Sequence, residues 1–199
     1  MNLMKKLVLF DFDGVLINSE MFYLDFWSKN LSIHNIFFSE KDLIGKNNIQ
    51  FLNQFDFTAV QIENLIFEKQ KAETNFFKNA IMDDSLKLLI KLLSKHLTIA
   101  IVSNNSQSNI TNFLVNNDCF NFFNQIVSND SGLKPKPNPE MYLKAILLHQ
   151  IKKEETLIIE DSPIGFESAK KASIDFVEFN FMNLDISINK IYRKLNINK

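Results

Sequence analysis

The chain has 199 residues, of which 46% are hydrophobic and 23% are charged, and its formal net charge is −1. These values exclude a mainly disordered chain and leave room for one well-packed domain that carries an insertion. A near-zero net charge argues against a broad basic surface for nucleic acid. The single cysteine, Cys119, cannot form an internal disulfide, which favours a reducing, cytoplasmic location.

Short apolar runs alternate with helical patterns over most of the chain. Strands are predicted at residues 7–10, 97–102, 125–127, 156–159 and 176–179, and helices at residues 84–94, 107–116, 139–149 and 165–171. The first run resembles the start of a signal peptide but stops at Asp11, and no segment reaches the roughly 18–20 apolar residues of a membrane span. Strands that alternate with helices predict an α/β fold with a doubly wound parallel sheet.

An all-helical segment interrupts this alternation directly after the first strand. Helical patterns cover residues 20–30, 40–44, 48–55 and 58–78, and no linker rich in proline, glycine or serine joins them to the rest. We therefore expect an α/β core formed by residues 1–17 and 81–199, with a helical domain of residues 18–80 inserted into it.

Polar residues follow the predicted strands at the points where these strands end. In chain order they are Asp11 and Asp13, then Ser103 and Asn104, then Lys134, then Glu160 and Asp161. Because the carboxyl ends of parallel strands meet at one edge of a sheet, we expect these side chains to converge on one ligand site.

The convergent residues suit phosphoryl transfer. Three or four carboxylates in one pocket repel each other unless a cation neutralises them, and Mg²⁺ prefers such oxygen ligands. Lys134 and Ser103 could hold phosphate oxygens, one carboxylate could attack phosphorus, and a second could protonate the leaving oxygen. Each motif taken alone is more simply a turn, a helix cap or a solvated lysine. All four in order, each behind a predicted strand, favour the functional interpretation.

Four segments resemble the motifs of the haloacid dehalogenase-like (HAD-like) hydrolases. They are residues 10–20 (FDFDGVLINSE), 101–104 (IVSN), 132–142 (GLKPKPNPEMY) and 158–170 (IIEDSPIGFESAK). The resemblance covers residues 7–179. It implies a Rossmann-like core with a small helical cap, as in the subfamily that includes β-phosphoglucomutase, phosphoglycolate phosphatase and many sugar-phosphate phosphatases.

The resemblance also implies roles for the acidic residues. Asp11 would be the nucleophile and a Mg²⁺ ligand, and Asp13 would be the general acid/base with its backbone carbonyl on the metal. Asp161 would be a direct metal ligand, and Glu160 would either bind the metal or hold a metal-bound water. The dehalogenases of the family lack the second acid of the first motif, so Asp13 favours phosphoryl transfer.

The remaining core motifs would bind the transferring phosphate. The resemblance gives this role to Ser103, to the backbone of Asn104 and to a lysine of the third motif. We choose Lys134 over Lys136 for that lysine, because the family pattern Lys-Pro-x-Pro makes Lys136 the variable position.

The cap is expected to select the substrate through the loop at residues 44–48. Gly45 looks like the family's cap-loop glycine, and Asn48 stands where phosphoglucomutase-like relatives have an arginine that grips a second phosphate. Lys46 could supply a positive charge or simply be solvated. Tyr23 and Trp27 could face the substrate, although packing inside the cap is favoured for both.

The resemblance thus implies an enzyme, a Mg²⁺-dependent phosphatase that hydrolyses a small phosphorylated metabolite, such as a sugar phosphate, through an aspartyl-phosphate. One alternative is a β-phosphoglucomutase-type isomerase, and another is a non-catalytic phosphate-binding or regulatory relative. We expect a cytoplasmic monomer whose partner is the metabolite rather than a nucleic acid or a membrane.

Overall fold

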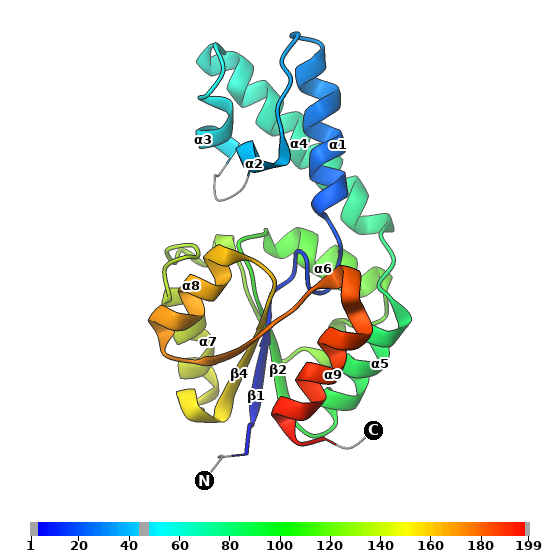
Figure 1. Ribbon diagram of the computed structural model, residues 1–199, viewed down its shortest axis with the longest axis vertical. Helices are drawn as coiled ribbons and strands as arrows, with labels where there is room; N and C mark the ends of the chain where they lie inside the picture. The colour runs from blue at the N-terminus through cyan, green and yellow to red at the C-terminus, as the bar shows by residue number, and fades with distance from the viewer. Residues whose placement is uncertain (1–3, 44–47, 198–199) are drawn as a thin grey trace.

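A computed structural model describes residues 4–43 and 48–197 of the chain. Its centre is a five-stranded parallel sheet with the strand order β3-β2-β1-β4-β5 (Figure 1). The strands are β1 (Leu7–Phe10), β2 (Thr98–Val102), β3 (Gln125–Val127), β4 (Thr156–Glu160) and β5 (Asp175–Glu178). The α/β prediction is confirmed, and every predicted strand is present within one or two residues of its expected bounds.

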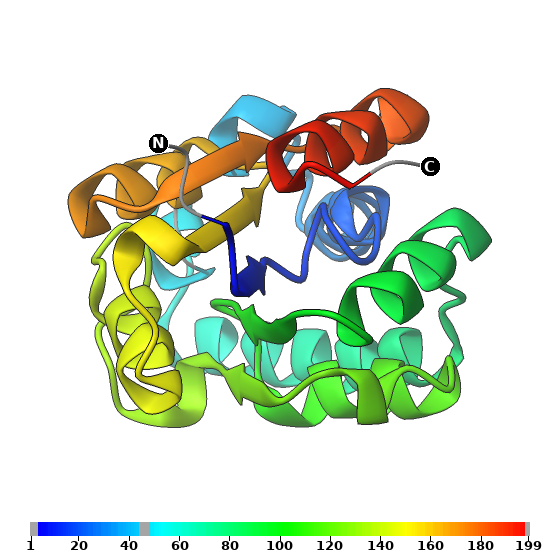
Figure 2. The same ribbon diagram turned by 90° about the horizontal axis from the view of Figure 1, so that it is seen from below.

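Helices cover both faces of the sheet (Figure 2). The side chains of β1 alternate between these two faces. Val8 and Phe10 pack on one face with α5 (Asp84–Ser94), α6 (Gln107–Asn116) and α9 (Leu184–Leu195). Leu7 and Leu9 pack on the opposite face with α7 (Glu140–His149) and α8 (Pro163–Ala172). Both faces of β1 are therefore buried, which explains why its sequence is a continuous apolar run. Helix α9 was not among the predicted elements, although Ile188 and Ile191 are spaced as one face of a helix requires.

Four helices form a separate layer beyond the carboxyl ends of the strands (Figure 1). They are α1 (Glu20–Ser32), α2 (Glu40–Leu43), α3 (Asn48–Leu52) and α4 (Ala59–Asn79). Their own apolar core contains Trp27, Leu31, Phe51 and Leu52. This helical insertion, which we call the cap, therefore has its own packing, and it stands over the edge of the sheet where the predicted site residues lie.

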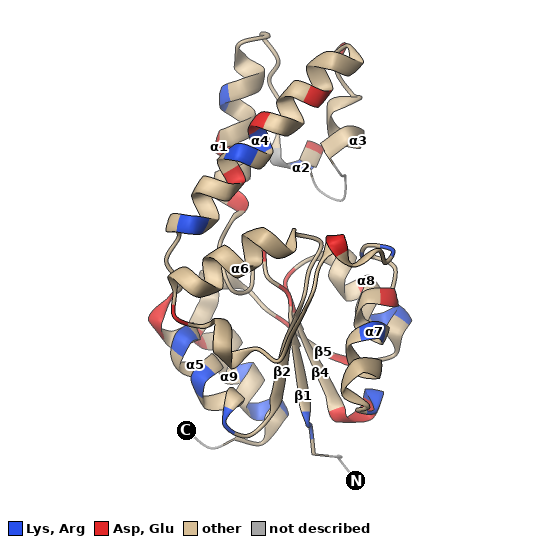
Figure 3. Ribbon diagram, turned by 180° about the vertical axis from the view of Figure 1, so that it is seen from behind, with Lys and Arg blue, Asp and Glu red and all other residues tan. Residues whose placement is uncertain are grey.

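The remaining short elements are the 3₁₀ turns η1 (Phe120–Phe122), η2 (Asn129–Ser131), η3 (Lys153–Glu155) and η4 (Phe181–Asn183). Lysine, arginine, aspartate and glutamate residues are interspersed over the helices, in keeping with the near-zero net charge (Figure 3). Within the described residues, no helix combines the length and the apolar character that a bilayer crossing requires.

The long helix α4 connects the cap to the core. It begins with a capping box between Thr58 and Gln61, and its later turns lie beside α6 (Figure 2). After α4 the chain returns to the core with neither proline nor glycine, and the buried Asn117 holds this return. Its Nδ2 donates to the Ala80 carbonyl (2.9 Å) and its Oδ1 accepts from the Met82 amide (2.8 Å).

Removal of the Asn117 side chain should destabilise the protein. Asn117→Ala leaves the buried amide of Met82 without its acceptor, so we expect the free energy of unfolding to fall by about 2 kcal/mol. Its neighbour Asn116 is exposed and bonds the same Ala80 carbonyl at 3.2 Å, so Asn116→Ala is the matched control, with an expected change below about 0.5 kcal/mol. Urea unfolding of both variants measures the difference, and equal changes would contradict this role for Asn117.

Candidate active site

A tight loop after β1 carries the first two acids. Asp11 continues the strand, with its amide donating to the Ile159 carbonyl (2.9 Å), and the chain then turns back through Gly14, whose amide donates to the Ile17 carbonyl (2.7 Å). Gly14 has φ +73°, and a Cβ there would run into the Asp161 carboxylate. Glycine is thus required at position 14 for two reasons, the left-handed backbone and the close approach of the Asp161 carboxylate.

Asp13 is held by two hydrogen-bond donors. Ser19 Oγ donates to its Oδ1 (2.5 Å), and Asn105 Nδ2 donates to its Oδ2 (2.8 Å). Burial raises the pKa of Asp13, while these two hydrogen bonds oppose the rise. Such a carboxyl is oriented and keeps access to its protonated form, as a general acid requires.

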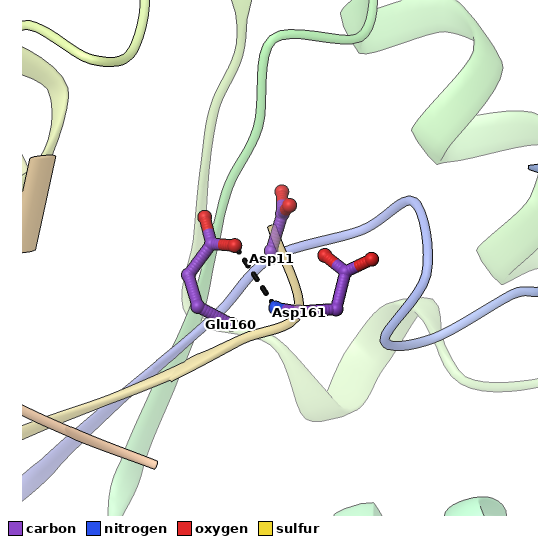
Figure 4. Close-up of side chains that lie close together, drawn as sticks. All are labelled: Asp11, Glu160 and Asp161. Carbon is purple, nitrogen blue, oxygen red and sulfur yellow. Dashed lines mark hydrogen bonds between the residues drawn. The ribbon is translucent and has the colours of Figure 1, made fainter. Parts of the chain in front are cut away.

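The end of β4 brings two more acids beside Asp11 (Figure 4). One oxygen each of Asp11, Glu160 and Asp161 lies within 4.8 Å of the others. A Cβ at Gly165 would run into the Glu160 carboxylate, so α8 approaches this closely only because it has glycine there. Three carboxylates from two neighbouring strand ends therefore meet in one place, as the sequence predicted.

These carboxylates fit a divalent cation. Burial and the nearby Glu160 carboxylate raise the pKa of Asp11 well above its usual range and that of Asp161 to about 7. Asp161 Oδ1 is also buried without a hydrogen-bond partner in the described part of the chain. Mg²⁺ would stabilise such crowded carboxylates, because its positive charge offsets their repulsion and it takes oxygen atoms such as Asp161 Oδ1 as ligands.

Lys136 lies inside this cluster. Its Nζ is 3.0 Å from Asp11 Oδ1 and 2.5 Å from Glu160 Oε1, and its side chain is 2% exposed. Burial alone would lower the pKa of Lys136, but the Asp11 and Glu160 carboxylates hold it well above the usual lysine value. Burial likewise would raise the pKa of Glu160, but the Lys136 ammonium and the hydrogen bonds from Lys136, Tyr142 and Ser162 together lower that pKa. Lys136 therefore remains charged at the centre of the site.

The structure corrects the choice of lysine. The side chain of Lys134 is 73% exposed and its Nζ lies 3.5 Å from Glu140, away from the acidic cluster. Lys136 is positioned instead, because Asn104 accepts from its backbone amide (2.9 Å) and donates to its carbonyl (3.2 Å). The sequence did hold a signal for this, since residues 136–139 form a second Lys-Pro-x-Pro run that overlaps the first.

Ser103 lies at the end of β2, buried, on the edge of the sheet that carries Asp11. Its amide donates to the Val127 carbonyl (3.0 Å), and its Oγ accepts from the Asn105 amide (3.1 Å). Ser103, Asn104 and Lys136 line the same cavity of about 600 Å³ as Asp11, Asp13 and Asp161.

Several polar residues at the site were missed by the sequence analysis. Asn105 and Ser19 bond Asp13, and Tyr142 donates from its hydroxyl to Glu160 Oε1 (2.9 Å). Trp27 packs inside the cap as expected, whereas Tyr23 lines the cavity instead of that core. Ser19 and Tyr142 lie within the first and third family motifs, and Asn105 directly follows the second, so the sequence held a signal for them. Their contacts with the acids appear only in the folded chain.

The predicted cap loop is described in part. Gly45 and Lys46 lie outside the described residues. Asn48 begins α3 and lines a second cavity, next to the first, that also reaches Asp13.

Comparison with known proteins assigns the family. Residues 8–179 match the model of the haloacid dehalogenase-like hydrolases. The validoxylamine A 7'-phosphate phosphatase of Streptomyces hygroscopicus subsp. limoneus is 22% identical over 178 residues, which cover 86% of this chain and 84% of the relative. The phosphorylated carbohydrates phosphatase of Thermotoga maritima is 25% identical over 181 residues, which cover 84% of this chain and 82% of the relative.

Solved structures agree on the fold. CbbY from Rhodobacter sphaeroides, solved in complex with phosphate, superposes with a TM-score of 0.78 at 17% identity and covers 98% of this chain and 100% of its own. A haloacid dehalogenase-like hydrolase from Bacteroides fragilis superposes with a TM-score of 0.75 at 25% identity, and the match covers 87% of each chain. With 172 consecutive residues matched by the family model, the chain belongs to the haloacid dehalogenase-like hydrolases.

Proposed function

We propose that the chain is a Mg²⁺-dependent phosphatase that hydrolyses a small phosphomonoester through an aspartyl-phosphate on Asp11. The observation that carries this proposal is the buried contact of Lys136 with Asp11 inside a cluster of carboxylates. A nucleophilic carboxylate, a fixed cation and a second, hydrogen-bonded acid in one cavity supply the groups that phosphoryl transfer requires.

The reaction has two steps. A carboxylate oxygen of Asp11 attacks phosphorus, the bond from phosphorus to the leaving oxygen breaks, and Asp13 gives its proton to that oxygen. In the second step Asp13 accepts a proton from water, whose oxygen attacks phosphorus. The bond to Asp11 then breaks, and inorganic phosphate leaves. Support for Asp13 comes from the bonds of Ser19 and Asn105, which orient its carboxyl.

Cationic and neutral donors would hold the phosphoryl oxygens. We assign this role to the Lys136 ammonium, the Ser103 hydroxyl and the backbone amide of Asn104. Lys136 replaces the Lys134 that the sequence favoured. Because Lys136 already neutralises part of the negative charge beside Asp11, a dianionic phosphate can approach a carboxylate that would otherwise repel it.

Asp11, Asp161 and the Asp13 backbone carbonyl would hold Mg²⁺, with Glu160 completing the acidic set. When bound, Mg²⁺ neutralises these carboxylates and the phosphoryl charge. Glu160 also has other partners, since it accepts from Lys136 and Tyr142 through Oε1 and from the Asp161 amide through Oε2. We therefore give Glu160 the additional role of holding Lys136 in place.

The cap would choose the substrate. We propose that residues 18–80 act as a cap over a core of residues 1–17 and 81–199, and that its closure excludes water from the aspartyl-phosphate. Two of the relatives that the chain resembles are a validoxylamine A 7'-phosphate phosphatase and a phosphorylated carbohydrates phosphatase, which supports a sugar phosphate as substrate. The Asn48 position, without the arginine of the mutases, favours hydrolysis over isomerisation. A cytoplasmic location and a monomeric state remain predictions.

Replacement of the nucleophile should abolish turnover. We expect Asp11→Asn to lower kcat at least about a thousandfold against any phosphomonoester that the wild-type protein hydrolyses with Mg²⁺, because an amide cannot form the aspartyl-phosphate. A screen of phosphorylated metabolites, p-nitrophenyl phosphate and acetyl phosphate, read as released phosphate, tests this. Failure of the wild-type protein on the whole panel would reject the phosphatase proposal.

The two neighbouring lysines should differ sharply. Lys136→Met removes the charge that contacts Asp11, so we expect kcat/KM to fall about 100- to 1,000-fold. Lys134→Met is the matched control and should stay within about twofold, because its side chain is exposed and away from the acids. A thermal melt of each variant separates loss of chemistry from loss of fold. Equal losses of activity in the two folded variants would contradict the assignment.

Removal of the metal should be reversible. We expect EDTA to abolish hydrolysis and added Mg²⁺ to restore it, since the crowded carboxylates require a neutralising cation. Asp161→Asn should raise the Mg²⁺ concentration for half-maximal activity at least about tenfold, because it removes a ligand charge. Hydrolysis that persists unchanged in EDTA would show that no divalent cation takes part.

A further inference from the structure

A second, polar cavity lies beside the acids and connects the cap to the core. It has a volume of about 970 Å³ and shares Asp13, Tyr23 and Lys136 with the catalytic cavity. The side chains that line it are mainly amides, hydroxyls and charged groups, from α3 and α4 of the cap and from the loop after β2. Such a lining suits a ligand that carries many hydrogen-bonding groups.

The most unusual feature of this cavity is an ion pair in the middle of α4. Lys69 and Glu73 lie one helical turn apart, only 7% and 8% exposed, with Lys69 Nζ 2.5 Å from Glu73 Oε1. Lys69 Nζ also lies 4.7 Å from the centre of the Tyr23 ring. Within the described chain, Glu73 is the only hydrogen-bond acceptor found for the three N–H groups of Lys69.

Stability alone does not explain this pair. Burying two charges costs free energy that their attraction often fails to recover, and an apolar pair would pack as well or better. The same helix carries a second pair, Lys71 and Glu68, at its exposed surface, where water solvates both charges. Basic and acidic residues thus occur along the length of α4 (Figure 3). Of these, only Lys69 and Glu73 are buried, and both line the cavity.

Asn105 and Tyr23 connect the pair to Asp13 through two hydrogen bonds and one cation–π contact. Asn105 Nδ2 donates to both Asp13 Oδ2 (2.8 Å) and the Tyr23 hydroxyl oxygen (3.4 Å), and Tyr23 contacts the pair. If Asp13 protonates the leaving oxygen, as proposed above, the remainder of the substrate begins beside Asp13. The Lys69–Glu73 pair is then within the space that the leaving group occupies.

The chemistry of the pair defines the group it would bind. An ammonium donates and a carboxylate accepts, so together they match neighbouring hydroxyl groups, each of which both donates and accepts. The pair has no net charge, so it offers little attraction to a second phosphate. We propose, resting on the function above, that Lys69 and Glu73 form a subsite for the hydroxyl groups of an uncharged, polyhydroxylated leaving group.

Kinetics on a matched substrate set test this proposal. D-glucitol 6-phosphate, D-glucose 6-phosphate and glycerol 3-phosphate carry hydroxyl groups, whereas ethyl phosphate and p-nitrophenyl phosphate do not. We expect the wild-type kcat/KM for at least one of the first three to exceed that for ethyl phosphate at least about tenfold. The double variant Lys69→Met/Glu73→Gln, which keeps side-chain volume and charge balance, should raise KM for that substrate about tenfold or more. Its kcat/KM for ethyl and p-nitrophenyl phosphate should stay within about twofold.

The control is the double variant Lys71→Met/Glu68→Gln, which removes the exposed pair of the same helix and should leave every substrate within about twofold. The proposal is overturned if the wild-type protein does not prefer any of the three hydroxyl-bearing substrates. It is equally overturned if the buried-pair variant loses activity on all substrates alike, since the pair would then act on Asp13 or on the cap's position, or if it changes none of them.

Binding measurements keep this test separate from the proposed function. Calorimetry with the same phosphates at fixed Mg²⁺ measures the subsite even where no phosphate is released. Tighter binding of a hydroxyl-bearing phosphate than of ethyl phosphate, lost in the buried-pair variant, supports the subsite although the phosphatase proposal has failed. Hydrolysis without any such preference rejects the subsite alone.

Discussion

The Lys136 ammonium group between Asp11 and Glu160 is the interaction on which the site depends. The carboxylates of Asp11, Glu160 and Asp161 lie close together and are largely buried, so their negative charges would repel each other strongly. Both described ion pairs of Asp11 and Glu160 are made with Lys136. A cation fixed in this position compensates part of the charge, and the remaining acid set then fits a divalent metal and a phosphate.

Small residues make this concentration of charge sterically possible. The Asp161 carboxylate occupies the space where a side chain at position 14 would lie, and the Glu160 carboxylate occupies the equivalent space beside Gly165. The parallel sheet brings the acids to one place, because β1 and β4 are neighbours and end at the same edge. The close approach of the acids therefore depends both on the two glycines and on the shared edge of the sheet.

Residues of both the cap and the core surround Asp13. Asp13 is held by Ser19, next to the first cap helix, and by Asn105, in the loop after β2. Asn105 also contacts Tyr23 of α1, so the general acid proposed here lies at the junction of the two parts. A cap that touches the acid/base residue can link the presence of a leaving group to the orientation of the carboxyl that must protonate it.

The sheet, the helical insertion and the residues at the strand ends could be predicted from the sequence, because apolar runs, helical spacing and strand-end acids are local patterns. The sequence also placed Asp11, Asp13, Ser103, Asn104, Glu160 and Asp161 on one edge, and the structure brings them together there. Lys134 and Lys136 could not be distinguished in this way, since both begin the same four-residue pattern and differ only in the folded chain, where Lys136 is buried beside the acids. The same holds for Lys69 and Glu73, because their spacing of four residues is also that of an ordinary exposed pair on a helix. Their burial depends on the packing of α4 against segments that are far apart in the chain, among them Tyr23 of α1.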